Sequence, residues 1–136
     1  MREIKRIILH CTATRESQAV SVADIDKWHR SRGFKKIGYH YVIHPQGELS
    51  LGRPVADQGA HVKHENVDSI GVAYIGGLTD TGEVADTMTI HQDVTFLMLV
   101  RSLRMVFGNL TLHGHNEFSN KACPSFDVQE KYSFLK

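Results

Sequence analysis

Five short segments carry the hydrophobic pattern of β-strands. Apolar residues form a continuous run or alternate with polar ones, which is typical of buried and half-buried strands. The segments are residues 4–10, 39–44, 48–52, 69–75 and 110–115. Pro45-Gln46-Gly47 separates the second from the third and predicts a hairpin turn. The polar, turn-rich segments 58–68 and 78–86 are predicted to be loops.

Two helices are predicted from their first residues. Ser21 with Asp24, and Thr89 with Gln92, have the spacing of a capping box, in which each side chain bonds the other residue's backbone N–H. Apolar residues then recur at helical spacing. They are Val22, Ile25 and Trp28 in the first helix, which runs to Gly33, and Phe96, Leu99, Val100, Leu103, Val106 and Phe107 in the second, which ends at Gly108-Asn109.

A last short helix is predicted near the end of the chain. Ser125, which follows Pro124, is a candidate N-cap for a helix that continues to Tyr132. Strands and helices thus follow one another without a repeat or a linker. The predicted fold is α/β, a single mixed central β-sheet flanked by helices, in one domain over residues 1–136.

Composition narrows the class of protein. A chain of 136 residues with 41% hydrophobic and 23% charged residues is typical of a globular domain with one core. The 16 basic and 15 acidic residues give a net charge of +1, which indicates neither a nucleic-acid partner nor a membrane surface. The first residues lack the apolar stretch of a secretory signal, and no segment is long and apolar enough to insert in a membrane. We therefore expect a protein made in the cytoplasm, or a mature form already trimmed. Because no apolar repeat is evident, we also expect a monomer.

Three side chains suggest a metal centre. His10 and His115 each end a predicted strand, and Cys123 lies in the segment Lys121-Ala122-Cys123-Pro124. Two imidazoles and a thiolate are suitable zinc ligands, and three protein ligands leave the fourth tetrahedral position open, as in catalytic sites. His113 competes with His115 because alternate residues of a strand share a face. The alternative is that these histidines are hydrogen-bonded residues of the core.

The two cysteines have a second interpretation. Cys11 and Cys123 are the only cysteines of the chain, and a single disulfide between them is the alternative to separate roles. If the first strand continues to Cys11, its side chain faces away from that of His10. Cys11 is then expected to be a small buried residue rather than a ligand.

An ordered set of short motifs resembles a known enzyme family. The motifs are Ile8-Leu9-His10-Cys11-Thr12-Ala13-Thr14, Trp28-His29, Gly38-Tyr39-His40, Gly59-Ala60-His61, Ser69-Ile70-Gly71-Val72 and Lys121-Ala122-Cys123-Pro124-Ser125-Phe126-Asp127. Together they resemble the zinc-dependent N-acetylmuramoyl-L-alanine amidases of the amidase-2 family, which includes phage lysozyme-like amidases and peptidoglycan recognition proteins. The resemblance covers nearly the whole chain and is strongest to the phage-type members.

The resemblance implies a role for particular residues. It makes His10, His115 and Cys123 the ligands of Zn²⁺, and it matches Tyr39 and Lys121 to the two non-ligand residues that phage-type members need for catalysis. In that role Lys121 would stabilise the oxyanion. Tyr39 would orient the water or donate a hydrogen bond to the intermediate.

The resemblance also implies a substrate. The expected reaction is hydrolysis of the amide between N-acetylmuramic acid and L-alanine in peptidoglycan, in a phage or prophage endolysin that acts on the cell wall. The alternative is a non-catalytic module that recognises peptidoglycan. His61, Asn66 and Thr12 are candidate substrate contacts, whereas the remaining histidines are expected to be structural or on the surface. They are His29, His40, His44, His64 and His91.

Overall fold

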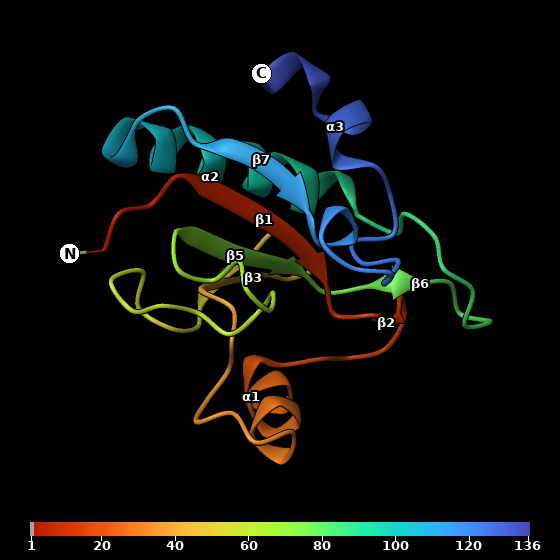
Figure 1. Ribbon diagram of the computed structural model, residues 1–136. Helices are drawn as coiled ribbons and strands as arrows, with labels where there is room; N and C mark the ends of the chain where they lie inside the picture. The colour runs from red at the N-terminus through yellow and green to blue at the C-terminus, as the bar shows by residue number, and fades with distance from the viewer. Residues whose placement is uncertain (1) are drawn as a thin grey trace.

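A five-stranded sheet forms the centre of the computed structural model, which describes residues 2–136 (Figure 1). Its strands, in spatial order, are β4 (Leu49–Leu51), β3 (Tyr41–Ile43), β5 (Ser69–Tyr74), β1 (Arg6–Cys11) and β7 (Thr111–Gly114). All neighbouring pairs are parallel except the hairpin of β3 with β4. The sheet is therefore mixed, as predicted.

Helices lie on both sides of this sheet (Figure 1). The remaining elements are β2 (Thr14–Arg15), α1 (Val22–Ser31), β6 (Gly77–Leu78), α2 (Ile90–Phe107), the 3₁₀ turn η1 (His115–Glu117), α3 (Val128–Lys131) and the 3₁₀ turn η2 (Ser133–Leu135). The arrangement confirms the α/β fold class. Among residues 2–136, no helix combines the length and the hydropathy needed to cross a bilayer.

The alternation of side chains along β1 gives the sheet two different faces. Ile7, Leu9 and Cys11 join the larger core, which packs against α2 and α3. Ile8 and His10 point to the opposite face, the side of α1. Cys11 is 3% exposed, so its predicted position in the core is confirmed. The same alternation directs His10 away from that core.

Both predicted capping boxes are present. Ser21 exchanges hydrogen bonds with Asp24, and Thr89 with Gln92, at the first turns of α1 and α2. Gln92 is fully buried, and its Nε2 also donates to the carbonyl oxygens of Ile43 and Ile75. This amide therefore attaches the start of α2 to the ends of β3 and β5.

Two details of the helix predictions are wrong. Val106 is 72% exposed because it lies at the margin of the apolar stripe of α2, in the last turn, where the core no longer covers it. Ser125 does not cap the last helix, because its φ of 76° departs from the extended conformation that an N-cap adopts. Asp127 caps α3 instead, and its side chain accepts the N–H of Glu130.

The strand predictions place every strand of the central sheet, with ends shifted by at most two residues. They miss a small parallel pair, β2 with β6. Each of these strands has two residues, too few to show a hydrophobic period. The segment 78–86, predicted as a loop, thus begins with one strand residue, Leu78.

Candidate metal centre and active-site cleft

The pairing of β1 with β7 brings two distant histidines together. The strands are parallel, with Leu9 opposite Gly114, so the next positions, His10 and His115, lie side by side. Their ring centroids are 4.7 Å apart. His10 is buried at 1% exposure, whereas His115, the first residue of η1, is half-buried. The sheet register thus positions both imidazoles at one point.

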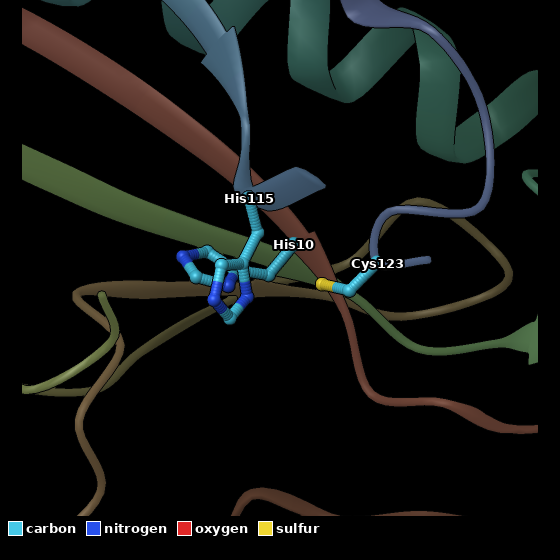
Figure 2. Close-up of side chains that lie close together, drawn as sticks. All are labelled: His10, His115 and Cys123. Atoms are coloured by element: carbon cyan, nitrogen blue, oxygen red, sulfur yellow. The ribbon is translucent and has the colours of Figure 1, made fainter. Parts of the chain in front are cut away.

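The segment before α3 carries Cys123 to the same point. Tyr74 donates to the carbonyl oxygen of Pro124 at 2.6 Å, and the Ser125 hydroxyl donates to that of Gly77 at 2.9 Å. These two bonds hold the segment against β5 and β6. Figure 2 shows the sulfur of Cys123 directed towards the two imidazoles. One ligand atom from each of His10, His115 and Cys123 lies within 4.8 Å of the others.

Two competing interpretations, His113 as the ligand and a disulfide between the cysteines, are not supported by the geometry. His113 is held by Thr111 Oγ1 at 2.9 Å and by Glu117 Oε1 at 3.0 Å, and it lies outside the cluster. Cys11 and Cys123 are both free thiols. The structure therefore brings together His10, His115 and Cys123, the three predicted ligands.

The environment of the cluster favours the metal-binding form of its imidazoles. Burial, with the neighbouring His61 and His115, lowers the pKa of His10 well below its ordinary value. Burial and Lys121 lower the pKa of His115. Both rings are therefore neutral near pH 7 and offer a lone pair. The Cys11 thiol and burial raise the pKa of Cys123 in the metal-free protein, so a bound cation has to displace its proton.

Comparisons with known proteins agree with this geometry. The model of the Amidase_2 family, N-acetylmuramoyl-L-alanine amidase, matches residues 1–126. The chain belongs to this family. The endolysin of Escherichia phage T7 is 37% identical over 123 residues, which cover 90% of this chain and 82% of the phage protein. The resemblance found in the sequence motifs is confirmed.

More distant relatives and solved structures extend the comparison. A peptidoglycan-recognition protein of Drosophila simulans is 30% identical over 130 residues, with 91% of this chain and 70% of that protein covered. The N-acetylmuramoyl-L-alanine amidase LysC from Clostridium intestinale superposes with a TM-score of 0.82 at 25% identity, over 97% of this chain and 87% of LysC. A bumblebee recognition protein, PGRP-SA, has the same TM-score at 21% identity, over 98% and 82% of the two chains, which shows a shared fold.

In this amidase-family protein the two imidazoles of the cluster, those of His10 and His115, line a cleft of about 490 Å³ on the α1 side of the sheet. Its lining residues come from five separate segments. They are His10, His29, Arg32, Phe34, Tyr39, Ala60, His61, Val62, Lys63, His115, Phe118, Ser119 and Lys121. The lining includes three cations and no carboxylate. Within residues 2–136, none of the three, Arg32, Lys63 and Lys121, forms an ion pair.

Both predicted catalytic residues line this cleft. The ring of Tyr39 lies between those of His10 and His29, with centroids 5.0 Å from each. Burial raises the pKa of the Tyr39 phenol, so the hydroxyl stays protonated and can donate a hydrogen bond. The exposed Lys121 lies near enough to the two imidazoles of the cluster to lower the pKa of His10 and His115.

The three predicted substrate contacts differ in position. His61 lines the cleft, and its Nδ1 lies 2.9 Å from His10 Nε2. Asn66 Oδ1 accepts the backbone N–H groups of His61 and Val62, which holds their loop. Thr12 Oγ1 accepts the N–H of Gly76 at 3.0 Å. Neither Asn66 nor Thr12 is among the lining residues.

Several lining residues were missed by the sequence analysis. His29, expected to be structural or on the surface, does accept the N–H of Gly38 through Nδ1, but it also lines the cleft. Arg32, Phe34 and Lys63 follow no motif that would mark them. Of this group, only His29 could have been predicted from the sequence, because it belongs to the Trp28-His29 motif. The prediction for His40 is confirmed, since it is fully buried and accepts the N–H of Gly71.

Proposed function

We propose that this protein is a zinc-dependent N-acetylmuramoyl-L-alanine amidase that hydrolyses the bond between N-acetylmuramic acid and L-alanine in peptidoglycan. The observation that carries the proposal is the convergence of His10, His115 and Cys123 in one cluster, whose two imidazoles line a cleft together with Tyr39 and Lys121. Family membership supports the reaction. The completeness of the ligand set favours an enzyme over a module that only binds peptidoglycan.

The donor set fits zinc. In a tetrahedral site with bonds of about 2.0–2.3 Å, ligand atoms are roughly 3.3–3.8 Å apart. The separations here are at most 4.8 Å, so small side-chain rotations close the site. Among the described residues no fourth His, Cys, Asp or Glu completes the group, which leaves one position for solvent or substrate. When bound, zinc supplies a Lewis acid and lowers the pKa of a coordinated water towards about 7.

Tyr39 and Lys121 have separate roles in the reaction. The neutral phenol of Tyr39 donates a hydrogen bond to the reacting oxygen of the amide, and the Lys121 ammonium stabilises the negative charge that develops there. Both groups lie at the wall of the cleft rather than in the metal cluster. Neither residue is needed to hold the metal. Mutation of either should therefore impair the reaction without reducing metal binding.

The charge of the cleft supports an anionic substrate. Arg32 and Lys63 line it without carboxylate partners, and peptidoglycan stem peptides carry free carboxylates. Opposite charges attract most strongly where the surroundings are partly shielded from water. We assign these two cations to the stem peptide rather than to the scissile amide. As in the phage endolysins to which it is similar, the physiological role would be cell-wall lysis.

A digest of purified peptidoglycan tests the proposal. The zinc-loaded protein should release stem peptides that begin with a free L-alanine amino group, as identified by mass spectrometry. Chelation should abolish the release, and added zinc should restore it. Binding of peptidoglycan without release would support the recognition module instead.

A further inference from the structure

The imidazole of His61 connects the buried ligand His10 to the backbone. His61 Nδ1 lies 2.9 Å from His10 Nε2, and His61 Nε2 lies 3.3 Å from the hydroxyl of Ser69. That hydroxyl in turn lies 2.7 Å from the carbonyl oxygen of Glu65. The contacts form one chain of four polar groups that begins at His10 of the metal cluster and ends at the backbone of Glu65.

The direction of each hydrogen bond in this chain follows from its last member. A carbonyl oxygen only accepts, so the single proton of the Ser69 hydroxyl points to Glu65. The Ser69 oxygen must then accept from His61, which places the His61 proton on Nε2. His61 Nδ1 is left with a lone pair, and it can only accept the proton on His10 Nε2. The Nδ1 of a neutral His10 is then unprotonated.

We propose that His61 and Ser69 fix the tautomer of His10, so that its Nδ1 is the atom offered to the metal. His61 is thus a positioning residue that acts through His10, and not a ligand. Outer hydrogen bonds of this kind orient the ring of a ligating histidine and raise its basicity. The inference rests on the proposed metal centre but not on the cleavage reaction.

The position of the His61 ring is tightly constrained. A Cβ at Gly71 would lie 2.6 Å from the ring carbons of His61, and a Cβ at Gly59 would lie 2.7 Å from one of them. Glycine is therefore required at both positions for the ring to occupy this place. Asn66 holds the backbone of His61 in addition. A ring confined in this way keeps the hydrogen-bond direction instead of rotating to a different partner.

The contacts also argue against the two other roles for His61. Both of its ring nitrogens already have partners, which leaves neither free to ligate a cation. For the same reason, its polar atoms are not available to a substrate in this arrangement. His61 therefore lines the cleft with the face or edge of its ring and not with its nitrogen atoms.

Nitrogen NMR of the metal-free protein tests the assignment without any variant. Near neutral pH, long-range proton–nitrogen spectra distinguish a protonated ring nitrogen from one with a lone pair. We expect both His10 and His61 to carry their proton on Nε2. A proton on His10 Nδ1, or an averaged mixture of tautomers, would overturn the proposal.

Zinc affinity supplies a second test. The variant His61→Phe keeps an aromatic ring over Gly71 but removes the acceptor, so it should bind zinc about 10–100-fold more weakly. His61→Asn keeps an acceptor near the position of Nδ1 and should recover most of that loss. Ser69→Ala should mix the tautomers of His61 and have a smaller effect in the same direction. His64→Asn, at an exposed histidine of the same loop, is the matched control and should not change affinity.

The outcomes separate this inference from the proposed activity. Unchanged zinc affinity in folded His61→Phe would refute the positioning role, even if the enzyme cleaves peptidoglycan. A protein that binds zinc with the expected tautomers but releases no peptide would refute the amidase proposal alone. Equal losses in His61→Phe and His61→Asn would assign His61 to packing and also contradict the inference.

Discussion

The backbone N–H of Cys11 donates a hydrogen bond to the sulfur of Cys123 at 3.1 Å. The two cysteines are therefore neighbours, and only Cys123 belongs to the cluster that could hold a metal. Cys11 directs its side chain into the core, while its backbone stabilises negative charge on the Cys123 sulfur. A thiolate is the form that binds zinc. This contact connects the end of β1 to the third member of the metal cluster.

Cysteine variants should separate these two functions. Cys123→Ser replaces the thiolate with a poor ligand, and we expect the protein to lose most of its zinc after dialysis against a weak chelator. Cys11→Ala retains the backbone donor and should keep its zinc. Elemental analysis of both purified variants measures the difference. Full zinc content in Cys123→Ser would remove this residue from the site.

Removing the phenol hydroxyl should impair catalysis alone. Tyr39→Phe is expected to lower kcat by about 10²–10³-fold, the usual effect of deleting one donor to a developing oxyanion. Zinc content should not change, because Tyr39 is not a ligand. Tyr41→Phe, at a half-buried tyrosine two residues away that lies outside the cleft, is the control. Equal rates for Tyr39→Phe and the parent protein would exclude the proposed donor role.

The two cations assigned to the stem peptide should affect substrate preference. Arg32→Gln combined with Lys63→Gln should raise KM for N-acetylmuramoyl-L-alanyl-D-glutamate and reduce the preference for it over its amidated counterpart. High salt should have a similar effect on the parent protein. Lys35→Gln, at an exposed position outside the cleft, should leave the preference unaltered. An unchanged ratio in the double variant would show that these charges do not select the substrate.

His29 should make stability depend on pH. Burial, together with Arg32 and Arg53, lowers the pKa of His29 from 6.5 to about 4. Since the unfolded state binds the proton more readily, stability falls as pH decreases from 6.5 towards 4, by at most about 1.4 kcal/mol per pH unit for this group.

The variant His29→Asn isolates that contribution. Its Oδ1 can accept the N–H of Gly38 in place of Nδ1, and it does not titrate. Urea unfolding across the acid range should therefore show a shallower loss of stability in this variant than in the parent protein. Parallel pH profiles would contradict the assignment.

The parts of the site that follow from local pattern could be predicted. His10 and His115 each end a predicted hydrophobic strand, and the motif around Cys123 pointed to the third member of the cluster. The choice between His113 and His115 came from the family resemblance, and the structure explains it through the hydrogen bonds that occupy His113. The two capping boxes were evident because their residues are three positions apart.

The remainder depends on tertiary contacts that have no local signal. His61 meets His10 only because its loop folds across β5, and the Gly71 that makes room for its ring is distant in sequence from His10. Arg32 and Lys63 become part of one cleft only when α1 and that loop lie over the same face of the sheet. Charge and spacing alone do not distinguish such residues from ordinary surface cations.

The central claim is that His10, His115 and Cys123 hold one zinc ion in an open site. A crystal structure of the zinc-loaded protein, with anomalous data collected on both sides of the zinc edge, tests it most directly. We expect one strong anomalous peak, from a zinc ion bonded to His10 Nδ1, to an imidazole nitrogen of His115 and to the Cys123 sulfur. Solvent should occupy the fourth position. A peak elsewhere, or a fourth protein ligand that closes the site, would contradict the account.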